Sequence, residues 1–229
     1  MDKIIEVKKI NKIYGTQIKT QVLFDMDLSI EQGSFNSIIG QSGSGKSTLL
    51  NVVGTLDKPT TGEVFIRGLR TDQMSANQLA ILRNETIGFI FQFHYLLPEF
   101  TAFENVLMPH YIKQGKVDKR QEARAHELMD LVGLTKVKNN LAGNMSGGQQ
   151  QRTAIARSLI NNAKLILADE PTGNLDSDTS EIIYELLRKI NKEFNTTFVI
   201  ITHDRRIAEK TDRIIEVKDG RIYSDFSRK

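Results

Sequence analysis

Residues 40–47 read Gly40-Gln41-Ser42-Gly43-Ser44-Gly45-Lys46-Ser47 and match the pattern G-x-x-x-x-G-K-[ST], which is typical of one class of α/β fold. A short β-prone run, residues 34–39, precedes it, and a helix-like run follows it as far as Gly54. Glycines let the backbone curl until its N–H groups point at one anion, and the start of a helix adds positive charge. We therefore predict a nucleotide-binding loop in which Lys46 reaches the terminal phosphates and Ser47 ligates Mg²⁺. The predicted nucleotide contacts are Gly40, Gln41, Ser42, Gly43, Ser44, Gly45, Lys46, Ser47 and Thr48.

An apolar run, residues 165–168, ends in two acids, Asp169 and Glu170. A buried strand that stops at a carboxylate brings it to the C-terminal edge of the sheet, where open α/β folds bind ligands. We expect Asp169 to hold Mg²⁺, directly or through water. Side chains alternate along a strand, so Glu170 points elsewhere and is expected to polarise the attacking water. Taken alone, the pair could also be two solvated acids; beside a phosphate loop, the metal-site interpretation is favoured.

The order of predicted elements indicates an α/β fold with a mainly parallel sheet, since strands alternate with helices. The first strands have no helix between them, which predicts an antiparallel edge. Residues 95–160 lose the strand signals and show helical spacing, so we predict one domain, residues 1–229, with a helical subdomain inserted at about 95–160. A helix is expected over 177–194 with Ser177 as its N-cap, and Asp219-Gly220 predicts a hairpin turn.

Composition narrows the class of protein further. Of 229 residues, 39% are hydrophobic, and 31 basic against 28 acidic residues give a net charge of +3. These values are ordinary for a folded soluble domain and argue against disorder. The absence of cysteine excludes disulfides, thiol catalysis, zinc–thiolate sites and iron–sulfur clusters. No run approaches the roughly 18 apolar residues of a membrane span, and the interspersed charges argue against a nucleic-acid partner.

The segment Met145-Ser146-Gly147-Gly148-Gln149 resembles the signature segment of the ATP-binding-cassette (ABC) ATPases, with Met145 in place of the usual leucine. The resemblance extends over nearly the whole chain and implies a P-loop NTPase core of the ABC type. It implies that Tyr14 stacks on adenine and that Asp176, in Asn174-Leu175-Asp176, contacts the nucleotide. It also implies that Gln92 links the metal site to the helical subdomain and that His203 is the switch histidine.

The same resemblance implies that two copies enclose two ATP molecules head to tail. Residues Ser146, Gly147, Gly148 and Gln149 of one copy then contact the ATP of the other. The catalytic group expected from it is Lys46, Gln92, Glu170 and His203, and the metal group is Ser47, Gln92 and Asp169. ATP and Mg²⁺ are the expected cofactors.

Two further stretches, residues 168–177 and 87–98, resemble the lipoprotein-release and macrolide- or peptide-export group of the family. That group implies a separate membrane permease and a place at the cytoplasmic face of the cell (inner) membrane. We expect the permease to contact Phe93, Tyr95, Leu96, Leu97 and Phe100, although these side chains could instead form a core beneath the helical subdomain. A regulatory ABC ATPase signalling to a membrane partner in cell division or antimicrobial-peptide sensing is the alternative function. ABC ATPases of DNA repair are excluded, because the interval from Gly40 to Asp169 leaves no room for their coiled coils.

Overall fold

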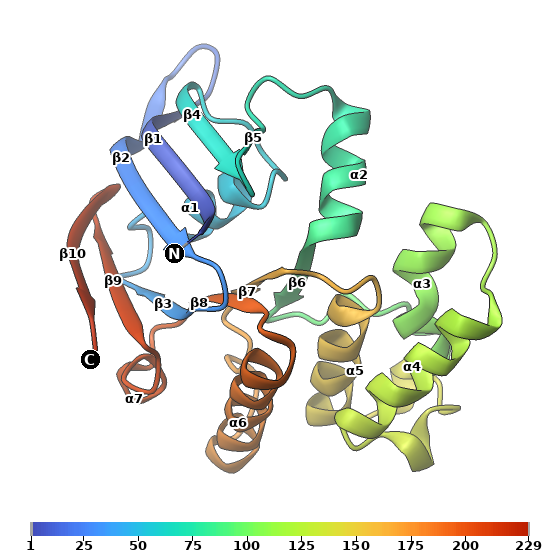
Figure 1. The fold of residues 1–229 in the computed structure, drawn as a ribbon. Helices are drawn as coiled ribbons and strands as arrows, with labels where there is room; N and C mark the ends of the chain where they lie inside the picture. Colours follow the sequence, from blue (N-terminus) through green and yellow to red (C-terminus); the bar gives the residue numbers. More distant parts are fainter. Residues whose placement is uncertain (1, 229) are drawn as a thin grey trace.

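The computed structural model describes residues 2–228 and contains two β-sheets with helices around them (Figure 1). The larger sheet has the strand order β10-β9-β3-β8-β7-β6, and all its neighbouring pairs are parallel except β10 with β9. Its strands are β3 (Phe35–Ile39), β6 (Ile87–Phe91), β7 (Leu165–Asp169), β8 (Thr197–Ile201), β9 (Arg213–Lys218) and β10 (Arg221–Ser227). Burial on both faces explains why β7 and β8 are nearly continuous apolar runs, whereas the equally buried β3 carries Asn36 and Ser37 between its apolar residues.

The smaller sheet is antiparallel, in the order β2-β1-β4-β5. It consists of β1 (Lys3–Tyr14), β2 (Thr20–Glu31), β4 (Thr61–Ile66) and β5 (Leu69–Arg70). The α/β class is confirmed, and the antiparallel strands prove to form a sheet of their own instead of extending the parallel one. The two sheets meet where Phe24 N donates to Gly220 O at 2.9 Å. Helix α1 (Lys46–Val53) contributes Leu49 and Leu50 to the core that both sheets share.

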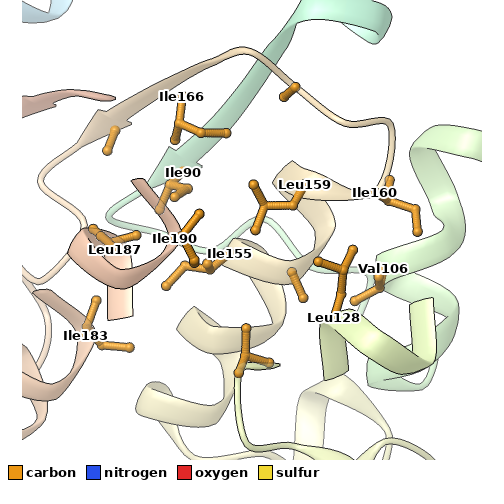
Figure 2. Packing of buried hydrophobic residues seen from close by; sticks show 14 of the residues in the cluster. Ile90, Val106, Leu128, Ile155, Leu159, Ile160, Ile166, Ile183, Leu187 and Ile190 are labelled. Carbon is orange, nitrogen blue, oxygen red and sulfur yellow. The ribbon is translucent and has the colours of Figure 1, made fainter. Parts of the chain in front are cut away.

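The other face of the larger sheet is covered by α5 (Gly147–Leu159) and α6 (Ser177–Phe194), which lie below it in Figure 1. Helices α3 (Ala102–Gln114) and α4 (Lys119–Leu131) pack against α5 on the side away from α6, with short 3₁₀ turns η1 (Thr135–Val137) and η2 (Ala142–Asn144) after α4. Figure 2 shows Val106 packed beside Leu128, and Ile155 beside Ile190 of α6, within a cluster that also includes Ile166 of the sheet. The helices of residues 102–159 are therefore fixed to the sheet through one continuous apolar core.

Two helical details differ from the sequence predictions. The helix 177–194 forms as expected, but its N-cap is Asp176 and not Ser177: the Asp176 carboxylate accepts from Thr179 N at 2.9 Å. Helix α2 (Ala76–Thr86) was not predicted, although Ser75 and Gln78 form a capping box at its start. The last helix is the short α7 (Arg205–Ala208). Within residues 2–228, no helix has the length and apolarity needed to span a membrane.

Candidate functional site

The loop between β3 and α1 curls around an open centre, as the glycine pattern predicts. Gly40 has φ +151°, and a Cβ there would lie 2.1 Å from Val217 O, so no larger residue fits. Gly45, the N-cap of α1, has φ +102°. The hairpin between β9 and β10 supports the loop, because Gly220 N donates to Ser44 O at 3.0 Å. The β9–β10 hairpin thus holds the loop in its curled conformation, and the start of α1 faces the centre of the loop.

Lys46 is held by the carbonyls of its own loop. Its Nζ donates to Gly40 O at 2.9 Å and to Gln41 O at 2.7 Å, and it lies 3.5 Å from Ser44 Oγ. Burial lowers the pKa of the Lys46 ammonium, and the charges of Glu170 and Asp169 oppose that shift. These contacts fix the Lys46 ammonium against the loop.

Asp169 lies at the end of β7, where it meets the start of α1. Ser47 Oγ is 3.5 Å from Asp169 Oδ1. Burial raises the pKa of Asp169, an effect to which the charge of Glu170 adds and which the Ser47 hydroxyl and Lys46 counter. Burial makes the ionised form of this carboxylate unfavourable, and a cation placed beside it would stabilise that ionised form.

Glu170 turns out of the strand and meets His203. The backbone of Glu170 has φ +48°, and its N–H donates to Ile201 O at 3.0 Å. Its Oε2 lies 2.8 Å from Nδ1 of His203, which follows the neighbouring strand β8. Parallel strands β7 and β8 pair Asp169 with Ile201, so the sheet itself brings Glu170 and His203 to one edge.

These groups line one cavity of about 540 Å³, which we call the phosphate cavity. Its lining residues are Val22, Gly40, Ser42, Gly43, Gly45, Lys46, Ser47, Thr48, Asp169, Glu170, Ile201 and His203. Gln41 and Ser44 do not line the cavity, but both contact the Nζ of Lys46. The structure thus brings together most of the residues that were predicted from the loop and the carboxylate pair.

Tyr14 does not line the phosphate cavity, and its side chain is held in place by Asp57 and Lys12. Its hydroxyl donates to Asp57 Oδ2 at 2.8 Å, and Lys12 Nζ lies 4.7 Å from the ring centroid and 2.6 Å from Asp57 Oδ1. Burial and the bond to Asp57 raise the pKa of the Tyr14 hydroxyl. Burial opposes ionisation of Asp57, but bonds from Lys12, Tyr14 and Lys58 N outweigh it and lower the pKa of Asp57. One face of the ring is thereby occupied, and its outer face, with the side chain 40% exposed, is available for stacking.

Gln92 follows β6 and does not line the phosphate cavity. Its Nε2 donates to Asn174 Oδ1 at 3.0 Å, and Asn174 Nδ2 donates to Gln92 O at 3.2 Å. Gly173 lies against it, since a Cβ there would be 2.8 Å from Gln92 Nε2. Asn174 belongs to the segment Asn174-Leu175-Asp176, but its partnership with Gln92 has no local sequence signal.

The signature segment, residues 145–149, begins α5. Ser146 is the N-cap and shares a capping box with Gln149: Ser146 Oγ accepts from Gln149 N, and Gln149 Oε1 accepts from Ser146 N. The first-turn N–H groups of Gly147 and Gly148 have no intrahelical partner, so they are free to bind an anion. With Asp176 they line a second cavity of about 320 Å³, the signature cavity, which shares no lining residue with the phosphate cavity.

Comparison with known proteins agrees with this geometry. A family model described as ABC transporter matches residues 23–173. The chain is 50% identical to the lipoprotein-releasing system ATP-binding protein LolD 1 of Rhodopseudomonas palustris, covering 97% of this chain and 99% of that protein. It is 47% identical to LolD of Shewanella oneidensis over 96% of this chain and 95% of the relative. A dimeric, post-hydrolysis structure of the ATP-binding cassette MJ0796 with ADP and Pi superposes with a TM-score of 0.89 at 42% identity, covering 97% and 98% of the two chains.

Proposed function

The chain belongs to the ABC transporter family, and from this premise we propose that it is the ATP-hydrolysing subunit of a transporter of the lipoprotein-releasing type. It binds MgATP in the phosphate cavity, pairs head to tail with a second copy and drives a separate membrane permease. The relatives named above favour lipoprotein release over macrolide or peptide export, and a transporter over a regulatory ATPase. We treat residues 1–229 as one ABC ATPase domain, with the helices of about 95–160 as its inserted subdomain.

One observation carries the proposal: the two halves of an ATP site lie apart on the same chain. The phosphate cavity holds the phosphate loop, Asp169 and the Glu170–His203 pair, whereas Gly147 and Gly148 open into the signature cavity. A second copy related by a two-fold axis places its signature segment over the first copy's phosphate cavity, and the reverse. Each closed site then has donors on both sides of the terminal phosphate.

The residues present suit Mg²⁺ in this site. Ser47 Oγ and Asp169 Oδ1 are close oxygen donors, and Mg²⁺ at nucleotide sites takes one or two protein oxygens together with phosphate oxygens and water. Consistent with that, the described residues contain no cluster of three or more His, Cys, Asp or Glu that would hold a metal alone. When bound, Mg²⁺ neutralises charge on the phosphate oxygens.

Within the closed site we assign each side chain a task. Lys46 and the loop N–H groups stabilise charge on the transferred phosphoryl group. Glu170 accepts a hydrogen bond from the attacking water and orients it, while His203 fixes the carboxylate through Nδ1. Tyr14 supports the adenine ring, and Gln92 joins the metal group once it leaves Asn174.

The permease contact is proposed at an apolar surface, the docking surface, which consists of the exposed Phe93, Tyr95, Leu97 and Phe100 together with the half-buried Leu96. Phe93 and Tyr95 are 63% and 67% exposed, so they do not form a core beneath the helical subdomain. A groove of about 190 Å³ runs beside them. Such an apolar patch, exposed in a chain that must work with a membrane protein, fits a helix or loop of that partner.

The docking surface is held rigidly. Asn105 donates to Leu97 O and Phe100 O and accepts from Leu97 N, while Arg157 donates to the backbone oxygens of His94 and Tyr95. A fixed surface next to Gln92 can transmit movement between the permease and the ATP site. We accordingly place the chain peripherally at the cytoplasmic face of the membrane, held by the permease.

The test is ATP-dependent dimerisation. Glu170→Gln keeps the phosphate contacts but removes the carboxylate, so with MgATP it should run as a stable dimer by light scattering and show no turnover. Adding Ser146→Arg, which blocks the signature segment, should return the Glu170→Gln protein to a monomer while calorimetry still detects bound ATP. A dimer that persists with Ser146→Arg, or a Glu170→Gln variant that hydrolyses ATP at the wild-type rate, would refute the proposal.

A further inference from the structure

A buried amide connects the signature helix to the turn that carries Glu170. Gln151 lies on α5, three residues after Gly148, and is fully buried. Its Nε2 donates to Pro171 O at 2.5 Å, while its Oε1 has no hydrogen-bond partner among the described residues. A buried amide that leaves one oxygen unpaired is costly, and an apolar side chain of similar size would avoid this cost. The donor bond to Pro171 is therefore the feature that distinguishes Gln151 from an apolar residue at this position.

The turn that Gln151 holds is in a strained conformation. Glu170 has φ +48°, a region that non-glycine residues rarely occupy, and it precedes a proline, which disfavours helical backbone in the residue before it. Such a conformation persists only where its surroundings impose it. Two of the imposed bonds lie within the sheet edge and the turn: Glu170 N donates to Ile201 O, and Gly173 N donates to Glu170 O.

The third bond, from Gln151, differs because it comes from another element. Helix α5 begins with the signature segment, which in the proposed dimer rests on the ATP of the opposite site. Glu170 serves the ATP bound by its own chain. A movement of α5 when the signature segment meets ATP therefore reaches Pro171 directly, and from Pro171 the adjoining backbone of Glu170.

We propose that Gln151 is a positioning residue that sets the Glu170 carboxylate and couples the two ATP sites of the dimer. The inference rests on the proposed function, because it needs the head-to-tail arrangement. Gln151 touches no substrate; it acts through the backbone of Pro171. It makes hydrolysis in one site depend on occupation of the other by a route inside a single chain.

The experiment compares Gln151→Met and Gln151→Asn with the wild-type chain in steady-state ATPase assays across MgATP concentration. Methionine keeps the volume and loses the donor, and asparagine keeps the amide but is one methylene too short to reach Pro171. We expect kcat to fall roughly tenfold or more, because small displacements of a catalytic group are enough to slow a reaction by this much. KM should stay within about twofold, because the phosphate loop is intact, and the Hill coefficient should fall from above 1 toward 1.

Asn191→Leu is the matched control. Asn191 is also a buried amide that donates to backbone carbonyls, Gly33 O and Thr196 O, but it lies on α6 away from both cavities. Its replacement should lower the melting temperature and leave kcat per folded chain and the Hill coefficient unchanged. If the Gln151 variants behave in the same way, or if the active wild type has a Hill coefficient of 1, the coupling proposal is overturned. A wild-type chain that neither hydrolyses ATP nor dimerises as Glu170→Gln would instead overturn the proposed function.

Discussion

Gln92 and Asn174 are joined by reciprocal hydrogen bonds, side chain to side chain at 3.0 Å and side chain to backbone at 3.2 Å, across 82 positions of sequence. The Gln92 amide is thus directed at Asn174, in the turn that follows Glu170. In the proposed function Gln92 serves the metal group, and that role requires the bond to Asn174 Oδ1 to break.

Asn174→Ala should raise the apparent affinity for MgATP, because MgATP binding then no longer has to break the bond between Gln92 and Asn174. A hydrogen bond worth about 0.5–1.5 kcal/mol corresponds to a gain of roughly two- to twelvefold in affinity. Calorimetry with MgATP on the Glu170→Gln background measures it without turnover. Asn139→Ala, at an exposed position, is the control. Unchanged or weaker binding in Asn174→Ala would show that Gln92 is not held back by Asn174.

Lys46→Ala should lose most of the ATP affinity, since it removes a cation that its own loop holds in place. Hydrogen bonds to charged groups contribute about 1.5–3 kcal/mol, so binding should weaken roughly 10- to 150-fold. Isothermal calorimetry checks this directly, with Lys19→Ala at an exposed site as the charge-matched control. Retained tight binding by Lys46→Ala would contradict the assignment of the phosphate loop.

Asp57→Asn should destabilise the fold near neutral pH and have no effect in acid. The pKa of Asp57 is lowered in the folded chain, so its ion pair with Lys12 contributes stability above the unfolded pKa of about 3.9. That contribution is lost as the pH falls through the lower folded pKa. In urea titrations at pH 7, the free energy of unfolding of the wild type should exceed that of Asp57→Asn by about 1 kcal/mol. This difference should disappear below about pH 4. A gap that is constant with pH would mean that the Asp57 charge contributes nothing.

Phe93→Ser combined with Tyr95→Ser should abolish copurification with the membrane partner. Exposed aromatics in a binding site commonly contribute more than 1 kcal/mol each, so losing both should weaken association at least tenfold. Pull-down from detergent-solubilised membranes, with the partner identified by mass spectrometry, measures the loss. Tyr223→Ser with Phe226→Ser removes two comparably exposed aromatics from β10 and should leave the complex intact. Equal losses in both pairs would show that the docking surface is not specific.

The parts of this molecule that could be predicted from sequence are those whose signal is local. The whole pattern of the phosphate loop lies within eight consecutive positions, and a run of apolar residues predicts the strand 165–169. Helix α2 had such a signal in its capping box, but its weak amphipathic pattern gave no supporting periodicity. At α6, two adjacent residues could both cap a helix, and the backbone placed Asp176 at the boundary.

The remaining contacts depend on how distant segments pack. Tyr14 meets Asp57 across 43 positions, and Gln151 meets Pro171 across 20. Neither partner carries a pattern of its own, because any acid or any carbonyl would satisfy the same chemistry. Only the pairing of strands and the position of α5 select these particular residues.

The separation of the phosphate cavity from the signature cavity sets how ATP consumption responds to abundance. If each site needs both cavities, as proposed, a single chain binds ATP without hydrolysing it. When chains are dilute, turnover should then rise with the square of their concentration and not in proportion to it. Monomers in excess of their partners would consume almost no ATP.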